Sequence, residues 1–297
     1  MKISLIATLV IVACSACSNA TSNSDKNSQV KYVLDSFIQS QKAEFSVSII
    51  GPDSGSQYAH NADKHFIMMS VVKFPQAVAL LHLVDEGLLS LDSTIFFDSV
   101  SLKRDTWSPF AEEHPYGDAR MTLRQCLDYS VGMSDNIVCD RLYELLHWTN
   151  VTTYIQSLGS KDFNIASNYK NLNKNQLNIN YTSANAMTHL LKQIADEKLL
   201  SENSRKVLLD IMKATTTGQN RLKGMLPNNT VVAHKTGTFF ENDSFINALN
   251  DVGIVYLPDG RYYCISVLVN NSLMGEEQTE KAIAYINQLY YKSFLKP

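Results

Sequence analysis

The sequence of 297 residues predicts an α/β fold of the α+β kind, in which an antiparallel sheet is built from both ends of the chain and an all-helical domain is inserted between them. Apolar residues alternate as in strands at 45–49 and again at 252–269. The middle of the chain instead repeats its apolar residues at helical spacing. We therefore assign residues 29–69 and 214–297 to the sheet domain and residues 70–213 to the helical domain.

The first residues have the composition of a leader for export. Lys2 precedes an apolar run from Ile3 to Ala13, which predicts a signal peptide within residues 1–17. This run is shorter than the roughly 20 residues that a membrane-spanning helix needs. It ends in Ile11-Val12-Ala13-Cys14, which resembles a bacterial lipoprotein cleavage box and predicts a lipid anchor at Cys14, with ordinary signal cleavage as the alternative. The polar residues 18–28 that follow are typical of a flexible tether.

The two ends of the mature chain supply the elements of the sheet layer. A helix is expected over 30–37, before the first strand, because its apolar residues lie at helical spacing. Two β-rich runs, 252–256 and 262–269, predict a hairpin near the other end. Apolar residues at helical spacing over 276–291 predict a closing helix, so both ends contribute a helix that can cover the sheet.

Charge and cysteine spacing exclude two classes of partner. The 26 Lys and Arg residues nearly balance the 29 Asp and Glu residues, which leaves a formal net charge of -3. Nucleic acid is therefore not an expected partner, because its binding needs a strongly positive surface. The cysteines do not have the spacing of a metal site, so we expect no metal and no cofactor. Cys126 and Cys139 can form a disulfide in an exported protein, but we favour two buried free thiols.

Ser70 and Lys73 are the first candidates for catalysis. In Ser70-Val71-Val72-Lys73 a hydroxyl and an amine stand at i and i+3, on one face of a helix, where the lysine can activate the serine. The pattern Ser-x-x-Lys is weak evidence alone, because it also begins at Ser28, Ser167 and Ser293. Ser70 differs from these in opening a strongly apolar helix, whose first N–H groups suit a developing oxyanion.

Two further polar motifs follow Ser70 in the chain. Ser134-Asp135-Asn136 lies in the helical segment, and Lys235-Thr236-Gly237-Thr238 begins a predicted strand after His234. In this order and on these elements, the three motifs together resemble the signature of class A β-lactamases and penicillin-binding proteins. The resemblance is closer to the cephalosporinase-leaning, extended-spectrum branch of class A. It extends over most of the chain from about Val30 and includes 70–75, 106–109, 129–136, 221–227, 234–238 and 250–254.

The resemblance implies a β-lactamase/transpeptidase-like fold and a role for each motif residue. Ser70 is expected to attack the β-lactam carbonyl and form an acyl-enzyme, with Lys73 taking part in the proton transfer. Ser134 is expected to pass a proton to the departing ring nitrogen. Asn136 is expected to hold the amide side chain of the substrate, and Lys235 to supply positive charge near the substrate carboxylate.

The residues around Lys235 receive their roles from the same resemblance. Thr236 is expected to add a hydroxyl contact to the carboxylate, and Gly237 is counted with the substrate-binding residues. The backbone N–H groups of Ser70 and Thr238 are expected to form the oxyanion hole. His234 is expected to be a structural neighbour of the lysine rather than a general base. Trp107 is expected either to line the mouth of the site or to serve only in packing.

One part of the family pattern is absent from this sequence. Class A enzymes carry a glutamate in a long loop after the Ser-Asp-Asn motif, where it orients the water that cleaves the acyl-enzyme. Here the stretch 165–172 contains no carboxylate, and aligning it from either end puts Ser167, Asn168 or Tyr169 at the glutamate's place. Asp162 can substitute only if the loop is rearranged. The residues that acylation needs are therefore all expected to be present, whereas the glutamate that deacylation needs is not.

These observations predict a serine hydrolase that reacts with penicillins or cephalosporins. We expect it to need no cofactor and to work as a monomer, in the periplasm or on a lipid anchor at Cys14. One alternative is a D-Ala-D-Ala peptidase, which shares the three motifs. The other is a β-lactam-binding protein that does not hydrolyse its ligand, an alternative that the absent glutamate favours.

Overall fold

The computed structural model describes residues 28–53 and 55–295 of the chain. The expected signal peptide and the lipidated Cys14 lie outside the described residues. A five-stranded antiparallel sheet forms the centre of the sheet domain, in the order β2-β1-β10-β9-β8. The strands are β1 (Glu44–Ile50), β2 (Gln57–His60), β8 (Val232–Asn242), β9 (Phe245–Tyr256) and β10 (Tyr262–Ser272).

The strand from the beginning of the chain pairs directly with the hairpin from its end. β1 pairs with β10 over seven residues, from Glu44 opposite Asn270 to Ile50 opposite Cys264. β9 and β10 are joined by a tight turn in which Gly260 has a φ of 85°, a conformation that favours glycine. The expectation of a sheet built from both ends is therefore confirmed.

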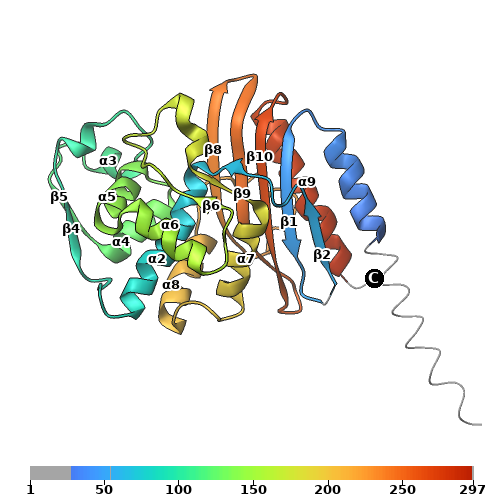
Figure 1. The fold of residues 1–297 in the computed structure, drawn as a ribbon, viewed down its shortest axis with the longest axis horizontal. Coiled ribbons are helices and arrows are strands. Elements are labelled where there is room, and N and C mark those ends of the chain that lie inside the picture. The colour runs from blue at the N-terminus through green and yellow to red at the C-terminus, as the bar shows by residue number, and fades with distance from the viewer. Residues whose placement is uncertain (1–27, 54, 296–297) are drawn as a thin grey trace, which may run out of the picture.

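The outer face of the sheet is covered by helices from the two ends of the chain (Figure 1). Residues 28–39 form the first helix, and α9 (Glu276–Phe294) is the last. Leu34 of the first helix and Ile286 of α9 are fully buried in one cluster with Val267 of β10. Alternate residues of a strand point to opposite faces of the sheet, so each face can have its own core. This cluster is the core of the outer face.

The inner face of the sheet packs against the helical part of the chain. Its core includes Val252 and Leu268 from the sheet together with Phe74, Val78 and Leu81 from the central helix. The helices are α2 (Lys73–Asp85), α3 (Pro109–Glu113), α4 (Leu123–Leu127), α5 (Asn136–Leu146), α6 (Trp148–Ser157), α7 (Ala184–Ala195) and α8 (Glu202–Lys213). Because α2 packs between the other helices and the sheet, its first turn lies where the helical part meets the sheet.

The helical domain predicted for residues 70–213 also contains short strands. This segment also contains a hairpin of two four-residue strands, β4 (Thr94–Phe97) and β5 (Ala119–Thr122). The two-residue strands β6 (Phe163–Asn164) and β7 (Tyr181–Thr182) pair with each other, and β7 also pairs with β3 (Phe66–Ile67). Strands this short show no clear alternation, so periodicity cannot distinguish them from loops.

Two further observations concern chain segments outside the catalytic motifs. Cys126, Cys139 and Cys264 are buried and free, in agreement with the prediction for the first two. Across 28–53 and 55–295, the helices are all too short or too polar to cross a lipid bilayer.

Candidate active site

Ser70 lies in a strained turn at the entrance to the central helix. The turn is a 3-10 segment, Met69–Val72, that leads directly into α2, and Met69 has an uncommon φ of 47°. The side-chain amide of Asn250 on β9 donates to the carbonyl of Met68 at 3.1 Å and holds the turn against the sheet. On β8, a Cβ at Gly237 would lie 2.3 Å from the same carbonyl, so glycine is needed for this close approach.

Lys73 is fully buried and points at the nucleophile. Its Nζ donates to Ser70 Oγ at 3.2 Å, to the carbonyl of Ser134 at 2.6 Å and to Asn136 Oδ1 at 2.7 Å. All three partners are uncharged oxygens. Burial lowers the pKa of Lys73 to about 8, so a substantial fraction is neutral near physiological pH and can accept a proton.

Ser134 and Asn136 stand on either side of a helix cap. Asp135 is the N-cap of α5, where its carboxylate accepts the N–H of Val138 at 2.9 Å. Ser134 lies within the helical segment, as expected, and precedes α5 in a left-handed conformation with a φ of 62°. The cap makes the helix begin at Asn136 and leaves Ser134 free to face the cavity.

Lys235 completes the cluster from the opposite wall. Its buried Nζ donates to Ser134 Oγ at 3.0 Å, while Lys73 Nζ lies 3.3 Å from the same hydroxyl oxygen. Burial, reinforced by the nearby charge of Lys73, lowers the pKa of Lys235 well below its ordinary value. The Ser134 hydroxyl therefore connects two lysines, one beside the nucleophile and one on the sheet.

His234 points to the other face of β8, as the alternation of strand residues requires. Its Nδ1 lies 2.9 Å from a carboxylate oxygen of Asp251, and both side chains are fully buried. Asp251 also accepts the N–H of Leu222 at 3.1 Å. This arrangement agrees with the expected structural role of His234 and ties the strand to the segment that carries Arg221.

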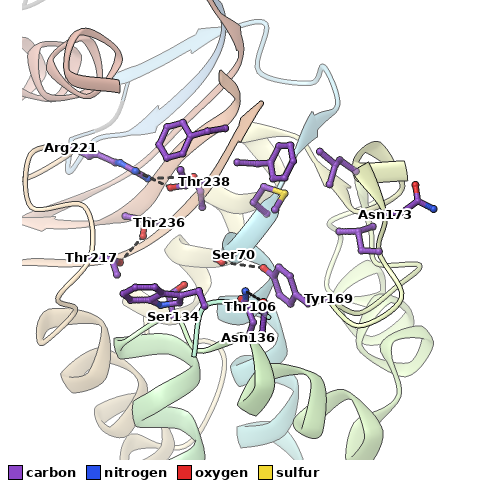
Figure 2. Close-up of a pocket in the computed structure, with 17 residues that line it drawn as sticks. Ser70, Thr106, Ser134, Asn136, Tyr169, Asn173, Thr217, Arg221, Thr236 and Thr238 are labelled. Carbon is purple, nitrogen blue, oxygen red and sulfur yellow. Dashed lines mark hydrogen bonds between the residues drawn. The ribbon is translucent and has the colours of Figure 1, made fainter. Parts of the chain in front are cut away.

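The cluster opens into a cavity of about 610 Å³ between β8 and the helical part of the chain (Figure 2). Thr236, Gly237 and Thr238 form one wall, so the structure brings the expected substrate-binding residues to one place with Ser70. Trp107 lies at the mouth with 56% of its surface exposed, and its indole N–H donates to the carbonyl of Met133 at 3.0 Å. Of the two expectations for Trp107, lining the cavity is correct.

Two polar residues of the wall, Arg221 and Thr217, received no role from the sequence. Arg221 Nη2 donates to Thr238 Oγ1 at 2.8 Å, and its Nε donates to the carboxylate of Glu280 on α9 at 2.9 Å. Thr217 Oγ1 lies 2.6 Å from Thr236 Oγ1. The only signal for Arg221 was its place in the family-like segment 221–227, and for Thr217 the sequence offered none.

Tyr169 contacts the nucleophile from the side of the loop. Its hydroxyl donates to Ser70 Oγ at 3.1 Å (Figure 2). Its ring centre lies 4.7 Å from Lys73 Nζ. Burial raises the pKa of Tyr169 well above its ordinary value, so the phenol stays protonated. Of the three positions left open by the loop alignment, Tyr169 is therefore the one that reaches Ser70.

The other residues that the loop alignment left open have different partners. Ser167 Oγ donates to the carbonyl of Asn168 at 3.2 Å, and the Asn168 side chain accepts the N–H of Asn171 at 3.2 Å. Asp162 lies in a separate surface pocket, where it accepts from His65 at 3.1 Å. A displaced carboxylate at Asp162 is therefore not part of the cavity around Ser70.

A buried carboxylate fixes the loop that carries Tyr169. Asp140 on α5 accepts the backbone N–H groups of Tyr169 at 2.7 Å and Lys170 at 2.8 Å. The same carboxylate pairs with Arg104 at 2.7 Å. Burial raises the pKa of Asp140, although Arg104 and the two N–H groups oppose this change. The position of the phenol thus depends on a contact that lies behind the loop.

Comparison with known proteins agrees with this geometry. The chain matches the model of the β-lactamase enzyme family over residues 28–294. It is 38% identical to the β-lactamase VEB-1 of Pseudomonas aeruginosa, over 88% of this chain and 89% of that protein. It is 36% identical to the extended-spectrum β-lactamase PER-1 of the same organism, over 90% of this chain and 88% of that protein.

A solved structure gives the same result. The crystal structure of a β-lactamase from Chitinophaga pinensis aligns with a TM-score of 0.86 at 37% identity, covering 89% of this chain and 99% of that one. The fold, the family match over nearly all described residues and the cluster of Ser70, Lys73, Ser134 and Lys235 agree with one another. The chain belongs to the class A serine β-lactamases.

Proposed function

We propose that this β-lactamase forms an acyl-enzyme at Ser70 at an ordinary rate and hydrolyses it slowly. The observation that carries the proposal is the hydrogen bond of 3.1 Å from the Tyr169 hydroxyl to Ser70 Oγ, in a loop without a carboxylate. The substrates are penicillins and cephalosporins, and reaction with them would contribute to resistance against these antibiotics.

The acylation half uses the two lysines and the serine between them. Neutral Lys73 takes the proton of Ser70 as its Oγ attacks the β-lactam carbonyl, a transfer that the contact of 3.2 Å permits. The proton then passes through the Ser134 hydroxyl to the departing ring nitrogen. As Ser134 gives its proton to the nitrogen it receives one from Lys73, and Lys235 holds Ser134 Oγ in place for this relay with a hydrogen bond of 3.0 Å.

Binding uses the residues of the cavity walls. The hydroxyls of Thr236 and Thr238 and the guanidinium of Arg221 face the place of the substrate carboxylate. Gly237 lets β8 come close enough to Ser70 for the N–H groups of Ser70 and Thr238 to bind one oxyanion. Asn136 holds the amide side chain of the substrate with its Nδ2 group, which in the free protein donates to Thr106 at 2.9 Å.

The deacylation half lacks a strong base on the side of the loop. A carboxylate at the position of the Tyr169 hydroxyl would accept a proton from the attacking water. A protonated phenol at that position can donate a hydrogen bond to the water but cannot take its proton. A positioned general base contributes about 10²–10⁴ in rate, and its absence makes release of the product rate-limiting.

Rapid-quench mass spectrometry of the intact protein tests the proposal. Mixing with a penicillin and, separately, with a cephalosporin should add one β-lactam mass within the first turnovers, followed by a slow steady state. Steady turnover without an accumulated adduct, at the 1–10³ per second that enzymes commonly reach, would contradict it. An adduct that is never released identifies instead a β-lactam-binding protein, the second candidate that Tyr169 favours.

We also propose that the enzyme is exported and held on a lipid anchor. The support is the order Ile11-Val12-Ala13-Cys14 after a short apolar run. Mass spectrometry of the mature protein should find a lipidated Cys14 as its first residue. A lipid-free product that begins after Cys17 would show ordinary signal cleavage.

A further inference from the structure

The slow hydrolysis proposed above still needs a group that takes the proton of the attacking water. Among the described residues, two side chains form hydrogen bonds with Ser70 Oγ: Lys73 at 3.2 Å and Tyr169 at 3.1 Å. Asp140, the acidic residue that fixes the loop, is bound to two backbone N–H groups and to Arg104. The choice is therefore between the amine and the phenol.

The geometry favours the amine. Lys73 Nζ lies over the Tyr169 ring, 4.7 Å from its centre, so the amine and the phenol share one side of the nucleophile. Once Ser70 Oγ has become an ester oxygen, it is a weak acceptor, and the Tyr169 hydroxyl is free to bind a water instead. A water held there lies within reach of Lys73, because both groups already meet at one oxygen atom.

We propose that Lys73 is also the general base of deacylation, and that the Tyr169 hydroxyl is the positioning group that holds the attacking water for it. This inference rests on the acyl-enzyme at Ser70 that forms the proposed function. It assigns to one lysine the proton transfers of both half-reactions, without help from a loop carboxylate.

Cavity sizes indicate from which side the water arrives. Behind the Tyr169 ring, the space bounded by Met69, Ser167 and Asn180 amounts to about 10 Å³, the lower limit for a single water. The substrate cavity in front of Ser70 has about 610 Å³. The substrate cavity can therefore supply the water freely, whereas the space behind the ring has room for one water at most.

The step balances without any further reactant. One O–H bond of the water breaks, its proton goes to Lys73 Nζ, and the oxygen bonds to the carbonyl carbon of the acyl group. When the tetrahedral intermediate collapses, the bond from carbon to Ser70 Oγ breaks and Lys73 returns the proton to that oxygen. The products are the ring-opened acid and the original enzyme, with Lys73 neutral again.

Burial keeps the Lys73 amine available as a base against the acidic groups that face it. From α5 and its cap it is faced by Asp135, Cys139 and Asp140, which favour its charged form, although the buried Cys139 has a pKa raised to about 12. From β8 it is faced by Lys235, and from the loop by the neutral Tyr169. Burial outweighs the acidic groups and sets the pKa of Lys73 at about 8.

A pH-jump experiment on the acyl-enzyme tests the inference. The adduct is formed with a slowly released cephalosporin, transferred to buffers between pH 6 and pH 10, and its decay is followed by intact mass. With a base of pKa about 8, the decay rate constant should rise about 50-fold from pH 6 to pH 8 and level off above pH 9. A rate independent of pH, or one that rises tenfold per unit through pH 10, would overturn the inference.

Two variants of one residue provide the matched controls. Tyr169→Phe keeps the ring over Lys73 but removes the hydroxyl, so decay should slow roughly fivefold with an unchanged midpoint. Tyr169→Glu supplies a carboxylate with an ordinary pKa near 4.3, so its decay should become flat between pH 6 and pH 8. An unchanged rate in Tyr169→Phe would remove the water-holding role.

Failure of the proposed function has a different signature. If no adduct is detected and no β-lactam is hydrolysed, the acyl-enzyme at Ser70 is wrong and the inference falls with it; if β-lactam is hydrolysed at about 1–10³ per second without an adduct, slow deacylation is wrong. If the adduct forms and decays without the expected pH profile, the proposed function stands and only the role of Lys73 in deacylation is refuted. An adduct that persists at every pH also refutes that role.

Discussion

The residues that contact Ser70 from two sides differ in how the fold holds them and in whether they can accept and pass on a proton. On the side of α2, α5 and β8, Lys73, Ser134 and Lys235 form a continuous chain of contacts between 3.0 and 3.3 Å, with the two lysines on a helix and a strand and Ser134 just before a helix cap. On the loop side, a single neutral phenol meets the nucleophile, and its backbone is fixed from behind by Asp140. Under the function proposed above, the first side equips Ser70 for acylation, whereas the second offers no carboxylate for deacylation.

Removing the nucleophile should have the largest effect, because both sides act through it. We expect Ser70→Ala to abolish the β-lactam adduct completely, as measured by intact mass after mixing. Ser293→Ala is a matched control, since Ser293 also begins a Ser-x-x-Lys pattern but donates to the carbonyl of Tyr290 on its own helix, away from the cavity around Ser70. An undiminished adduct in Ser70→Ala would remove Ser70 from its role.

Placing a carboxylate on the loop side should bring the rate of deacylation closer to that of acylation. We expect Tyr169→Glu to accelerate deacylation by about 10²–10⁴ while leaving the acylation rate within a few fold, measured in single-turnover experiments. Ser167→Glu and Asn168→Glu serve as controls, because their side chains do not point to Ser70. Acceleration in one of these and not in Tyr169→Glu would show that the loop register is different.

The contact behind the loop should matter for stability and for the position of the phenol. Asp140→Ala leaves two backbone N–H groups and Arg104 without their acceptor, so we expect the free energy of unfolding to fall by about 3 kcal/mol. Urea titration measures this change.

Asp162→Ala removes an exposed pair with His65 and should change stability by less than about 0.5 kcal/mol, with turnover unaffected. Lost turnover in Asp162→Ala would contradict the position of this carboxylate.

We expect the smallest effect on kinetics from substitutions of Trp107, which lies at the mouth of the cavity. Trp107 is half exposed, and an aromatic contact is worth about 0.5–1.5 kcal/mol, so Trp107→Ala should raise KM roughly two- to tenfold with kcat nearly constant. Trp107→Phe should recover most of this loss. A large fall in kcat would mean that Trp107 orders the turn around Ser134 through its bond to Met133.

The sequence predicted the well-anchored side of the site better than the loop side, for physical reasons. Ser70, Lys73, Ser134 and Lys235 occur in short motifs whose spacing is set by a helix, a helix cap and a strand. Tyr169 reaches Ser70 from a loop of irregular length, so its register becomes visible only when Asp140 and its two N–H contacts are seen.

Other residues escaped prediction because their neighbours are distant in the chain. Arg221 belongs to the site through Thr238 and Glu280, which no local pattern connects to it. The short strands of the helical part were missed because two to four residues are too few for alternation to be recognised. The sheet and its covering helices were predicted well, because their apolar patterns extend over many residues.

The three buried thiols make the folded protein suitable for selective chemical labelling. Burial raises the pKa of Cys126 and Cys139 to about 12 and that of Cys264 further, so the reactive thiolate is scarce at neutral pH. In a chain that begins after Cys17, a cysteine introduced at the exposed Asn173 on the rim of the cavity would be the accessible thiol. A fluorophore attached there would report the arrival of the β-lactam and the release of the product in one continuous trace.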